Sequence, residues 1–353
     1  MALTSRGKAA VAGGAVVAVL GGGMAALALS GNAPDPVQEA LHKIGVAPAP
    51  AEPCPLTGET LPGDKQPPDR PVLAVKVENT PDAQPLAGLE NADIVYEEVV
   101  EGGITRFVAL YHCSTADRIG PVRSIRSTDP KILAPFSEHP LLAFSGGSKG
   151  VRNIVEDAGM TTLDETSAVK AFSRDDGRVA PHNLFTSTKP LWAKGGSLAG
   201  GEPAPASPFV YSDEATKPNK KARSATIVFS GLATADWRWS NGHWVRFLDG
   251  SPMMLEHGAP IAADNVVIQV VKTAESDFTD VAGYASPEVD LVGQGRAWVL
   301  RDGRLIVGKW EREDEDGFTT FRSKSGDEIA LKPGTTFVEL APVGMFDAEI
   351  SFG

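Results

Sequence analysis

The chain has 353 residues, with 33 Lys and Arg against 45 Asp and Glu, which gives a formal net charge of −12 at pH 7. This length exceeds one ordinary core and predicts two domains behind an N-terminal segment. The acidic balance, with no long tract of clustered Lys and Arg, argues against general nucleic-acid binding. Residues 100–190 differ from the rest, because their 11 Lys and Arg slightly outnumber their 10 Asp and Glu. A locally neutral, arginine-rich region in an acidic protein is the composition expected of a specific anion site.

The first thirty residues have the pattern of an export signal. Two positive charges, Arg6 and Lys8, precede 22 residues without a charge, from Ala9 to Ser30. Small residues at 28–30 would allow cleavage, but the apolar run is also long enough to span a bilayer. Residues 1–30 are therefore either a signal peptide or an N-terminal membrane anchor. Both alternatives place the protein outside the cytoplasm, membrane-anchored or secreted.

Residues 31–70 are rich in Pro, Ala and Gly and predict a tether. The chain has two cysteines, Cys54 near the end of this tether and Cys113. In an exported protein such a pair favours a disulfide, for which there is one intrachain connection. A metal pair or a free nucleophile is the alternative, but neither cysteine has a CxxC partner and His112 is a lone neighbour. We therefore predict a disulfide and no metal site.

Three apolar runs follow the tether, at residues 72–77, 92–100 and 104–112, and they predict strands. Gly102-Gly103 marks a corner between the second and third runs. Arg106 alternates with Val108 and Leu110, so it is expected on an apolar strand face. A guanidinium in that position needs a carboxylate, and Glu97 or Glu101 is expected to neutralise it in part.

The segment from Arg118 to Pro130 is the densest chemical motif of the chain. It carries three arginines and three hydroxyl residues, Arg118, Arg123, Arg126, Ser124, Ser127 and Thr128. Guanidinium forks suit carboxylate or phosphate oxygens, and a helix predicted at residues 128–136 would add unpaired N–H groups. Pairing of these arginines with surface carboxylates is an equally open alternative.

A further strand at 139–144 leads into the glycine-rich loop Ser145–Gly150 and a helix that ends at Gly159. This loop is either a plain turn or an anion cradle, to which Ser148, Lys149 and Arg152 would contribute. It matches neither a Walker sequence nor a dinucleotide fingerprint, so no cofactor is predicted. Farther along, His182 and Asn183 stand between apolar anchors. They are expected either at a pocket edge or in a structural role.

Residues 195–221 are poor in large apolar residues and predict a linker. Beyond it, Asn241-Gly242 and Asp302-Gly303 are two-residue hairpin signals within β-rich sequence. The fold class is therefore α+β or α/β, with a mixed N-terminal α/β domain at 71–194 followed by a smaller antiparallel β-rich domain at 222–353. Trp237, Trp239 and Trp244 are interpreted as closing a β core rather than stacking on a sugar.

Taken together, several segments resemble the YerB-like family, a group of bacterial exported proteins, mostly lipoproteins, that share a domain of unknown function. They are Pro71-Val-Leu-Ala-Val-Lys-Val-Glu-Asn79, Ala92-Asp-Ile-Val-Tyr-Glu-Glu98, Glu101-Gly-Gly-Ile-Thr-Arg-Phe107, Ile119-Gly-Pro-Val-Arg-Ser-Ile-Arg126, Ser145-Gly-Gly-Ser148 and Pro181-His-Asn-Leu-Phe185. The resemblance covers residues 54–342 and implies an envelope-exposed protein in two parts, without a settled activity. No cysteine follows the apolar segment, so a peptide anchor or full secretion is expected in place of lipid modification.

Two functions fit these observations. One is binding of an anionic envelope component, such as a wall glycan, a phosphate-containing polymer or a peptide carboxylate. The other is hydrolysis of a glycan or phosphodiester in the envelope. Ligand-binding candidates are Arg106, Arg123, Ser124, Arg126, Ser148, Lys149, Arg152, His182 and Asn183. Catalytic candidates are Glu97, Glu98, Glu101 and His182.

Whether the protein is an enzyme is left open by the sequence. Binding is favoured because donors are plentiful while no catalytic set has a recognisable spacing. A carboxylate and His182 meeting at Arg123 would favour hydrolysis instead. In either case we expect Arg106, Arg123, Arg126 and His182 to converge near the Ser145–Gly150 loop.

Overall fold

A computed structural model describes residues 51–63, 65–199, 203–280 and 283–353. The predicted signal or anchor at 1–30, and the tether up to residue 50, lie outside the described residues. Within the described ranges, no helix combines the length and apolar character needed to cross a membrane.

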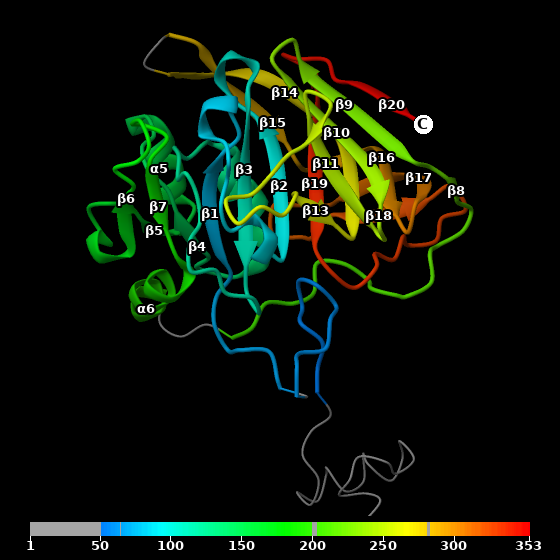
Figure 1. The fold of residues 1–353 in the computed structure, drawn as a ribbon, viewed down its shortest axis with the longest axis horizontal. Coiled ribbons are helices and arrows are strands. Elements are labelled where there is room, and N and C mark those ends of the chain that lie inside the picture. The colour runs from blue at the N-terminus through cyan, green and yellow to red at the C-terminus, as the bar shows by residue number, and fades with distance from the viewer. Residues whose placement is uncertain (1–50, 64, 200–202, 281–282) are drawn as a thin grey trace, which may run out of the picture. The chain divides into compact units, whose positions relative to one another are not determined.

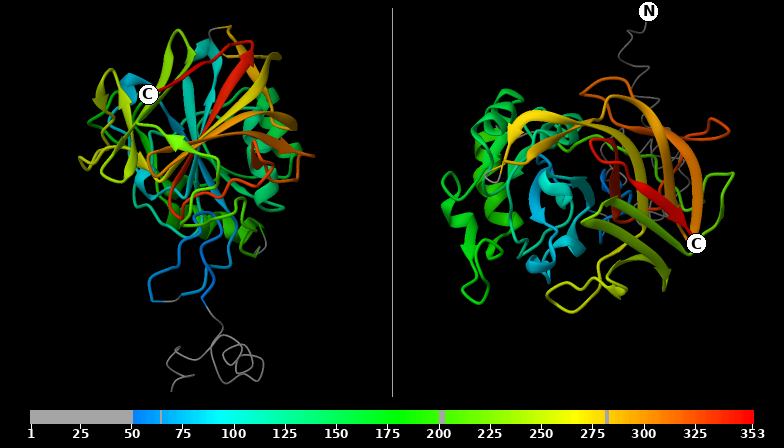
Figure 2. Two further views of the ribbon diagram at one scale, coloured as in Figure 1. Left: turned by 90° about the vertical axis from the view of Figure 1, so that its right-hand side faces the viewer. Right: turned by 90° about the horizontal axis from the view of Figure 1, so that it is seen from above.

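A twelve-stranded sheet runs through both halves of the chain, in the order β18-β17-β16-β14-β19-β2-β3-β1-β4-β5, with β15 paired to β14 and β8 to β17 (Figure 1). Its strands are β1 (Leu73–Glu78), β2 (Ile94–Val99), β3 (Thr105–Tyr111), β4 (Leu141–Ala143), β5 (Thr161–Leu163), β8 (Lys220–Lys221), β14 (Asn265–Thr279), β15 (Ala285–Asp290), β16 (Gly293–Arg301), β17 (Arg304–Arg312), β18 (Thr320–Ser323) and β19 (Thr336–Gly344). Figure 2 shows the strong twist of these strands. Every residue of β1 and β3 is buried, as expected of central strands covered on both faces.

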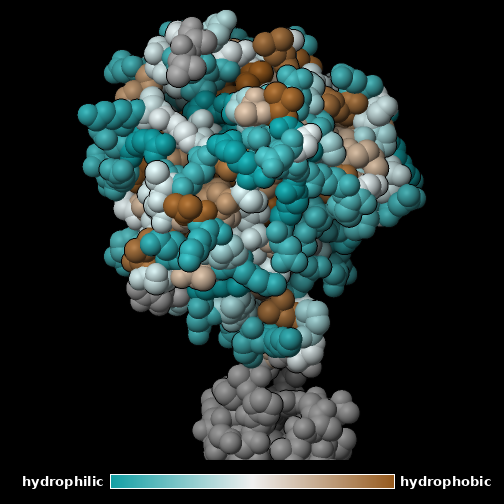
Figure 3. Space-filling view, turned by 60° about the vertical axis from the view of Figure 1, so that its left-hand side comes forward, coloured by the Kyte–Doolittle hydropathy of each residue, from teal (hydrophilic) through white to brown (hydrophobic). Residues whose placement is uncertain are grey.

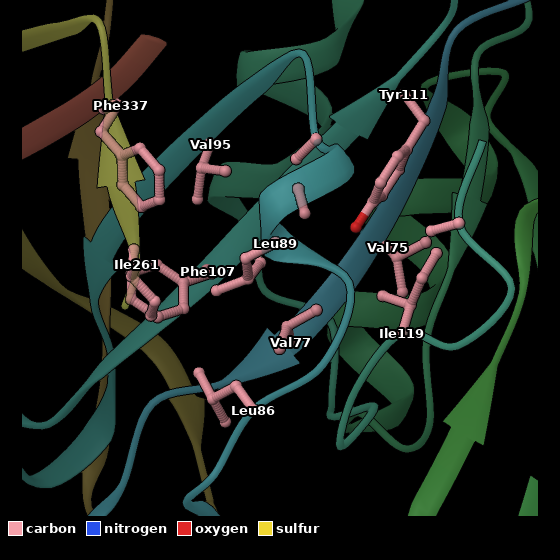
Figure 4. Close-up of a cluster of buried hydrophobic side chains, with 14 of the residues drawn as sticks. Val75, Val77, Leu86, Leu89, Val95, Phe107, Tyr111, Ile119, Ile261 and Phe337 are labelled. Atoms are coloured by element: carbon pink, nitrogen blue, oxygen red, sulfur yellow. The ribbon is translucent and has the colours of Figure 1, made fainter. Parts of the chain in front are cut away.

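One face of this sheet is covered by a second, six-stranded sheet. Its strands are β9 (Ser224–Ser230), β10 (Ala233–Ser240), β11 (His243–Leu248), β12 (Ser251–Pro252), β13 (Ala262–Ala263) and β20 (Glu349–Phe352). The core between the sheets contains Phe107 and Phe337, whose ring centroids are 6.1 Å apart (Figure 4). Trp237 lies 5.0 Å from Phe337 by ring centroids, and Trp237 and Trp244 are fully buried. The prediction that these tryptophans close a β core is confirmed.

The other face is covered mainly by two short helices, α4 (Thr128–Leu133) and α5 (Lys149–Asp157). A third helix, α6 (Thr188–Ala199), packs instead on the side of the first core. Short 3₁₀ turns lie at η1 (Pro81–Ala83), η2 (Leu89–Asn91), η3 (Glu101–Gly103), η4 (Ala134–Phe136) and η5 (Val169–Ala171). A two-stranded ribbon of β6 (Phe172–Arg174) and β7 (Leu184–Thr186) completes the described elements.

The predicted strands at 72–77, 92–100, 104–112 and 139–144 and both predicted hairpins are confirmed. Within the β-rich sequence after the linker, residues 328–331 make only isolated bridges and form no strand. The sequence also missed α6, which extends into the predicted linker. The described fold is mixed and mostly β. Its predicted two-domain layout stays a prediction, because β2 and β19 pair directly and join both halves in one sheet.

Cys54 and Cys113 form a disulfide, with their Cα atoms 6.1 Å apart, which confirms the predicted pairing. Cys54 and Leu56 are buried, so the end of the predicted tether packs onto the fold. His112 Nδ1 lies 3.5 Å from Cys113 Sγ. Cys54, Cys113 and His112 lie close enough together to hold a metal ion, but the disulfide leaves neither cysteine with a thiol to bind one.

Loss of this disulfide through a double Cys54→Ala and Cys113→Ala variant is expected to lower the free energy of unfolding by about 4 kcal/mol. The reason is that a bond across 59 residues restricts the unfolded chain. Denaturant unfolding of wild type and variant measures the difference, and mass spectrometry of unreduced protein should find no free thiol. A loss below about 1 kcal/mol, or alkylation of both cysteines in the native protein, would contradict the expectation.

Candidate anion site at the carboxyl edge of the sheet

The strands β1, β2, β4 and β5 run parallel to one another, because β1 and β2 are both antiparallel to β3 and β4 and β5 follow β1. Their carboxyl ends therefore meet at one edge of the sheet, where β3 begins. Ligands of open sheets bind outside such edges. At this edge Glu78, the last residue of β1, is the register partner of Arg106 near the start of β3.

Arg126 is the most completely paired of the arginines at this edge. Its Nε lies 2.7 Å from Glu101 Oε2, and its Nη1 donates to the carbonyl of Ile125 at 2.7 Å. The other oxygen of Glu101 accepts from the hydroxyl of Ser286 in β15. Both Arg126 and Glu101 are buried. This ion pair forms the floor of the site.

Arg123 and His182 meet at a single carboxylate oxygen. Oε2 of Glu78 lies 3.0 Å from His182 Nδ1 and 3.5 Å from Arg123 Nε. Glu78 is 2 % exposed, whereas the side chains of Arg123 and His182 are 23 % and 22 % exposed. The other oxygen of Glu78 accepts from Thr80 Oγ1 at 3.0 Å. A buried, fixed carboxylate thus holds a guanidinium and an imidazole toward the surface.

Arg106 lies beside these groups without a carboxylate of its own. It is 7 % exposed, and no ion pair joins its guanidinium to any carboxylate of the described residues. Its one hydrogen bond there is a long contact of 3.5 Å from Nη1 to the carbonyl of Ser124, and its Nε has no partner. Glu101 bonds Arg126 and makes no direct pair with Arg106, but its charge partly neutralises Arg106, as expected.

Burial is the main cause that lowers the pKa of Arg106 to about 10, and the charges of Arg126 and Arg123 lower it further, while Glu101 and Glu78 partly offset them. At this pKa the guanidinium is still charged at neutral pH. We call Arg106, Arg123 and Arg126 the arginine cluster. The cluster carries three positive charges beside two direct carboxylates, and Arg106 is its buried cation with an unpartnered Nε.

The glycine-rich loop lies against the arginine motif, as predicted. The amide of Ser145 donates to the carbonyl of Arg123 at 2.9 Å, and the amide of Ile125 donates to that of Gly146 at 3.2 Å. Gly146 has φ +91°, and a Cβ there would lie 2.7 Å from Ser124 Oγ. A side chain at this position would be strained by the positive φ and would displace the hydroxyl of Ser124.

The other loop candidates have separate roles in the structure. The hydroxyl of Ser148 accepts from Val151 N at 3.3 Å and caps α5. Arg152 pairs with Asp164 at 3.3 Å, and its guanidinium lies 5.1 Å from the ring centroid of Phe144, the residue after β4. Lys149 is exposed. No hydrogen bond or ion pair of the described residues connects Ser148, Lys149 or Arg152 to the arginine cluster.

Asn183 is tied to the glycine-rich loop through two charged side chains. Arg174 Nη1 donates to Asn183 Oδ1 at 2.8 Å, and its Nη2 lies 2.6 Å from Glu165 Oε1. The second oxygen of Glu165 accepts from Ser145 Oγ at 2.6 Å. These bonds join the loops after β4, β5 and β6 into one rim. His182, the residue before Asn183, lines an open hollow together with Gln84 and Arg178.

The three glutamates proposed as catalytic groups are buried in ion pairs. Glu98 pairs with Lys76, which also lies 2.6 Å from Asp129 Oδ1. Glu97 pairs with Arg246 at 2.7 Å, and Arg246 also lies 3.2 Å from Glu339. Glu101 holds Arg126. None of the three contacts His182 among the described hydrogen bonds, and the carboxylate that does is Glu78.

Arg118, the first arginine of the motif, lies apart from the cluster. Its Nη2 is 2.6 Å from Asp175 and its Nε 2.7 Å from Glu256, and the guanidinium stacks 3.5 Å from the ring centroid of Phe185. The alternative of surface pairing therefore describes Arg118, whose side chain is 37 % exposed. It does not describe Arg106.

Two family profiles match the chain side by side. The N-terminal domain of the DUF3048 family, described as proteins of unknown function, matches residues 56–199, and the C-terminal domain of the same family matches residues 225–338. The chain belongs to this YerB-like family. The resemblance seen in the sequence is thereby confirmed, and the arginine cluster with Glu78 and His182 lies wholly within the N-terminal match.

A curated relative from Bacillus subtilis (strain 168), named "Putative lipoprotein YerB", is 26 % identical over an alignment of 302 residues that covers 82 % of this chain and 86 % of the relative. The crystal structure of the YerB protein from Bacillus subtilis has a TM-score of 0.69 at 25 % identity. That alignment covers 85 % of this chain and 99 % of the solved chain. The similarity thus extends over both halves of the long sheet.

Proposed function

We propose that this protein is an extracytoplasmic envelope protein that binds an anionic ligand at the arginine cluster. The observation that carries the proposal is Arg106, a buried guanidinium with an unpartnered Nε between two further arginines. A buried cation without a partner costs free energy, and an anion would offset that cost. The ligand would be a wall glycan carrying anionic groups, a phosphate-containing polymer or a peptide carboxylate.

The location outside the cytoplasm has three supports. Residues 1–30 have the pattern of a signal peptide or anchor, and the relative from Bacillus subtilis is named a lipoprotein. The disulfide fits an oxidising compartment. On the face shown in Figure 3, apolar residues are scattered among hydrophilic ones and form no broad patch.

Arg123→Lys is expected to weaken binding of inorganic phosphate by about 10-fold to 150-fold. The charge is kept but the bidentate fork is lost, which is worth roughly 1.5 to 3 kcal/mol. Isothermal calorimetry against inorganic phosphate, sulfate and acetate measures the effect and separates phosphate-like from carboxylate ligands. Arg118→Lys is the matched control, because Arg118 belongs to the same motif but pairs with Asp175 and Glu256.

Unchanged affinity in Arg123→Lys would reject the arginine cluster as the binding site. Absence of phosphate, sulfate and acetate binding by the wild-type protein would reject the proposed function itself.

A further inference from the structure

Glu78 and His182 have the geometry of a carboxylate that orients an imidazole. The contact of 3.0 Å joins Glu78 Oε2 to Nδ1 of the ring. With Glu78 ionised, Nδ1 donates the proton, and in the neutral ring Nε2 keeps its lone pair. This is the tautomer in which a carboxylate-bound histidine accepts a proton through its other nitrogen.

The carboxylate is held rigidly. Its second oxygen accepts from Thr80 Oγ1 at 3.0 Å, and the amide of Glu78 donates to the carbonyl of Pro121 at 3.0 Å. His182 is fixed on its own side by a backbone bond of 2.9 Å from its amide to Val179. Its ring nevertheless lines an open hollow. The base is therefore fixed in orientation and accessible, as general-base catalysis requires.

We infer that His182, oriented by Glu78, is the general base of a phosphoester hydrolysis in which Arg106 and Arg123 bind the phosphoryl group. This inference rests on the proposed anion binding and adds a reaction to it. The same Glu78 oxygen lies 3.0 Å from His182 Nδ1 and 3.5 Å from Arg123 Nε, so His182 adjoins the arginine cluster through this carboxylate. Guanidiniums aimed at phosphoryl oxygens stabilise the charge of the transition state.

The carboxylates argue for a phosphoester over a glycoside. Glycoside hydrolysis ordinarily uses two carboxyl groups that flank the bond. Here Glu97, Glu98 and Glu101 are buried in ion pairs, and Glu78 is 2 % exposed and engaged by His182 and Thr80. No described carboxylate pair at this edge is left free to act as acid and base on a sugar.

In the step we infer, a water molecule gives a proton to His182 Nε2 while its oxygen forms a bond to phosphorus. The bond from phosphorus to the ester oxygen breaks, and the departing alkoxide takes a proton from solvent. The imidazolium then releases its proton to solvent, so the sum is ester plus water giving phosphate and alcohol. Ser124 is not used, because no hydrogen bond of the described residues connects it to His182.

The test uses the exported protein with bis(p-nitrophenyl) phosphate as a diester and p-nitrophenyl phosphate as a monoester. Hydrolysis of at least one is expected, and His182→Ala should lower kcat by roughly 10²-fold to 10⁴-fold. Added imidazole should restore part of the activity of His182→Ala but none to Glu78→Gln, whose ring remains in place. His257→Ala is the control, since that histidine is 52 % exposed and lies 3.9 Å from Glu90.

His182→Gln serves as a second variant if His182→Ala does not fold, and phosphate affinity is measured for every variant. Full turnover in a folded His182 variant, or no turnover of either ester by a wild-type protein that binds phosphate, overturns the catalytic inference alone. Failure of the wild type to bind phosphate or sulfate overturns the inference, and failure to bind acetate as well overturns the proposed binding.

Discussion

Arg106→Met is expected to stabilise the ligand-free protein while it abolishes stabilisation by phosphate. Arg106 is 7 % exposed, lacks an ion pair among the described residues and is repelled by Arg123 and Arg126. Methionine fills similar space without the cost of burying a charge. The free energy of unfolding in anion-free buffer should therefore rise by about 1 kcal/mol or more. If Arg106 had a structural role alone, its replacement would lower the free energy of unfolding.

Phosphate provides the second half of this experiment. A ligand that binds only the folded state stabilises it by about 2.7 kcal/mol at 100 times its dissociation constant. Wild-type protein should show a concentration-dependent gain of this kind, and Arg106→Met should show none. Chemical unfolding with and without phosphate, at constant ionic strength, measures both effects. Sodium chloride at matched ionic strength separates specific binding from screening.

Arg238→Met is the matched control for Arg106→Met. Arg238 pairs with Asp236 on the surface, with 44 % of its side chain exposed, and its guanidinium lies over Phe247. Its replacement should change stability by less than about 1 kcal/mol and leave the phosphate effect intact. A loss of 2 kcal/mol or more in ligand-free Arg106→Met would assign Arg106 a structural role.

Local signals in the sequence predicted most strands correctly. Asn241-Gly242 and Asp302-Gly303 join β10 to β11 and β16 to β17, because left-handed residues are required at those turns and Asn, Asp and Gly supply them. Alternation in β3 also assigned Arg106 correctly to the face shared with Val108 and Leu110, which lie in one core. These features depend on neighbours in sequence, so they can be predicted without tertiary contacts.

The parallel pairing of β19 with β2 and β14 could not be predicted in this way. Its partners lie far apart in sequence, and no turn fixes their register. Helix α6 was missed because Gly195-Gly196 has low helix propensity. The structure gives one reason for the first glycine, since a Cβ at Gly195 would lie 2.6 Å from Leu141. Close packing of the helix on β4 and β5 outweighs propensity there.

The side chains that meet at the candidate site were predicted in part. Arg106, Arg123, Arg126 and His182 were named from donor-rich segments, and the structure brings them to one edge of the sheet. Glu78 was missed as their shared carboxylate, because it reads locally as the end of a strand before a turn. Only the antiparallel register of β1 and β3 places it opposite Arg106. Sequence reasoning that paired these two strands explicitly could have found it.

Lys76→Met is expected to be the most destabilising of the replacements considered, with a loss of about 3 to 5 kcal/mol at pH 7. Lys76, Glu98 and Asp129 are all fully buried, and Lys76 is the cation that lies between the two carboxylates. Removing one partner of a buried ion pair leaves an uncompensated charge. Lys131→Met is the control, since its partner Glu288 is 44 % exposed, and it should cost less than about 1 kcal/mol.

The pH dependence of this loss identifies its cause. Burial raises the pKa of Glu98 above its ordinary value of 4.5, and the charge of Lys76 partly lowers it, so Lys76→Met should raise it further. A carboxyl with a raised pKa in the folded state loses stability as pH rises and regains it as pH falls toward the unfolded value. The loss in free energy of unfolding caused by Lys76→Met should therefore become smaller between pH 7 and about pH 5. Adding Glu98→Gln to this variant should recover part of the lost stability at pH 7. A deficit that is independent of pH, as unfolding in denaturant would reveal, would point to lost packing in place of an unpaired charge.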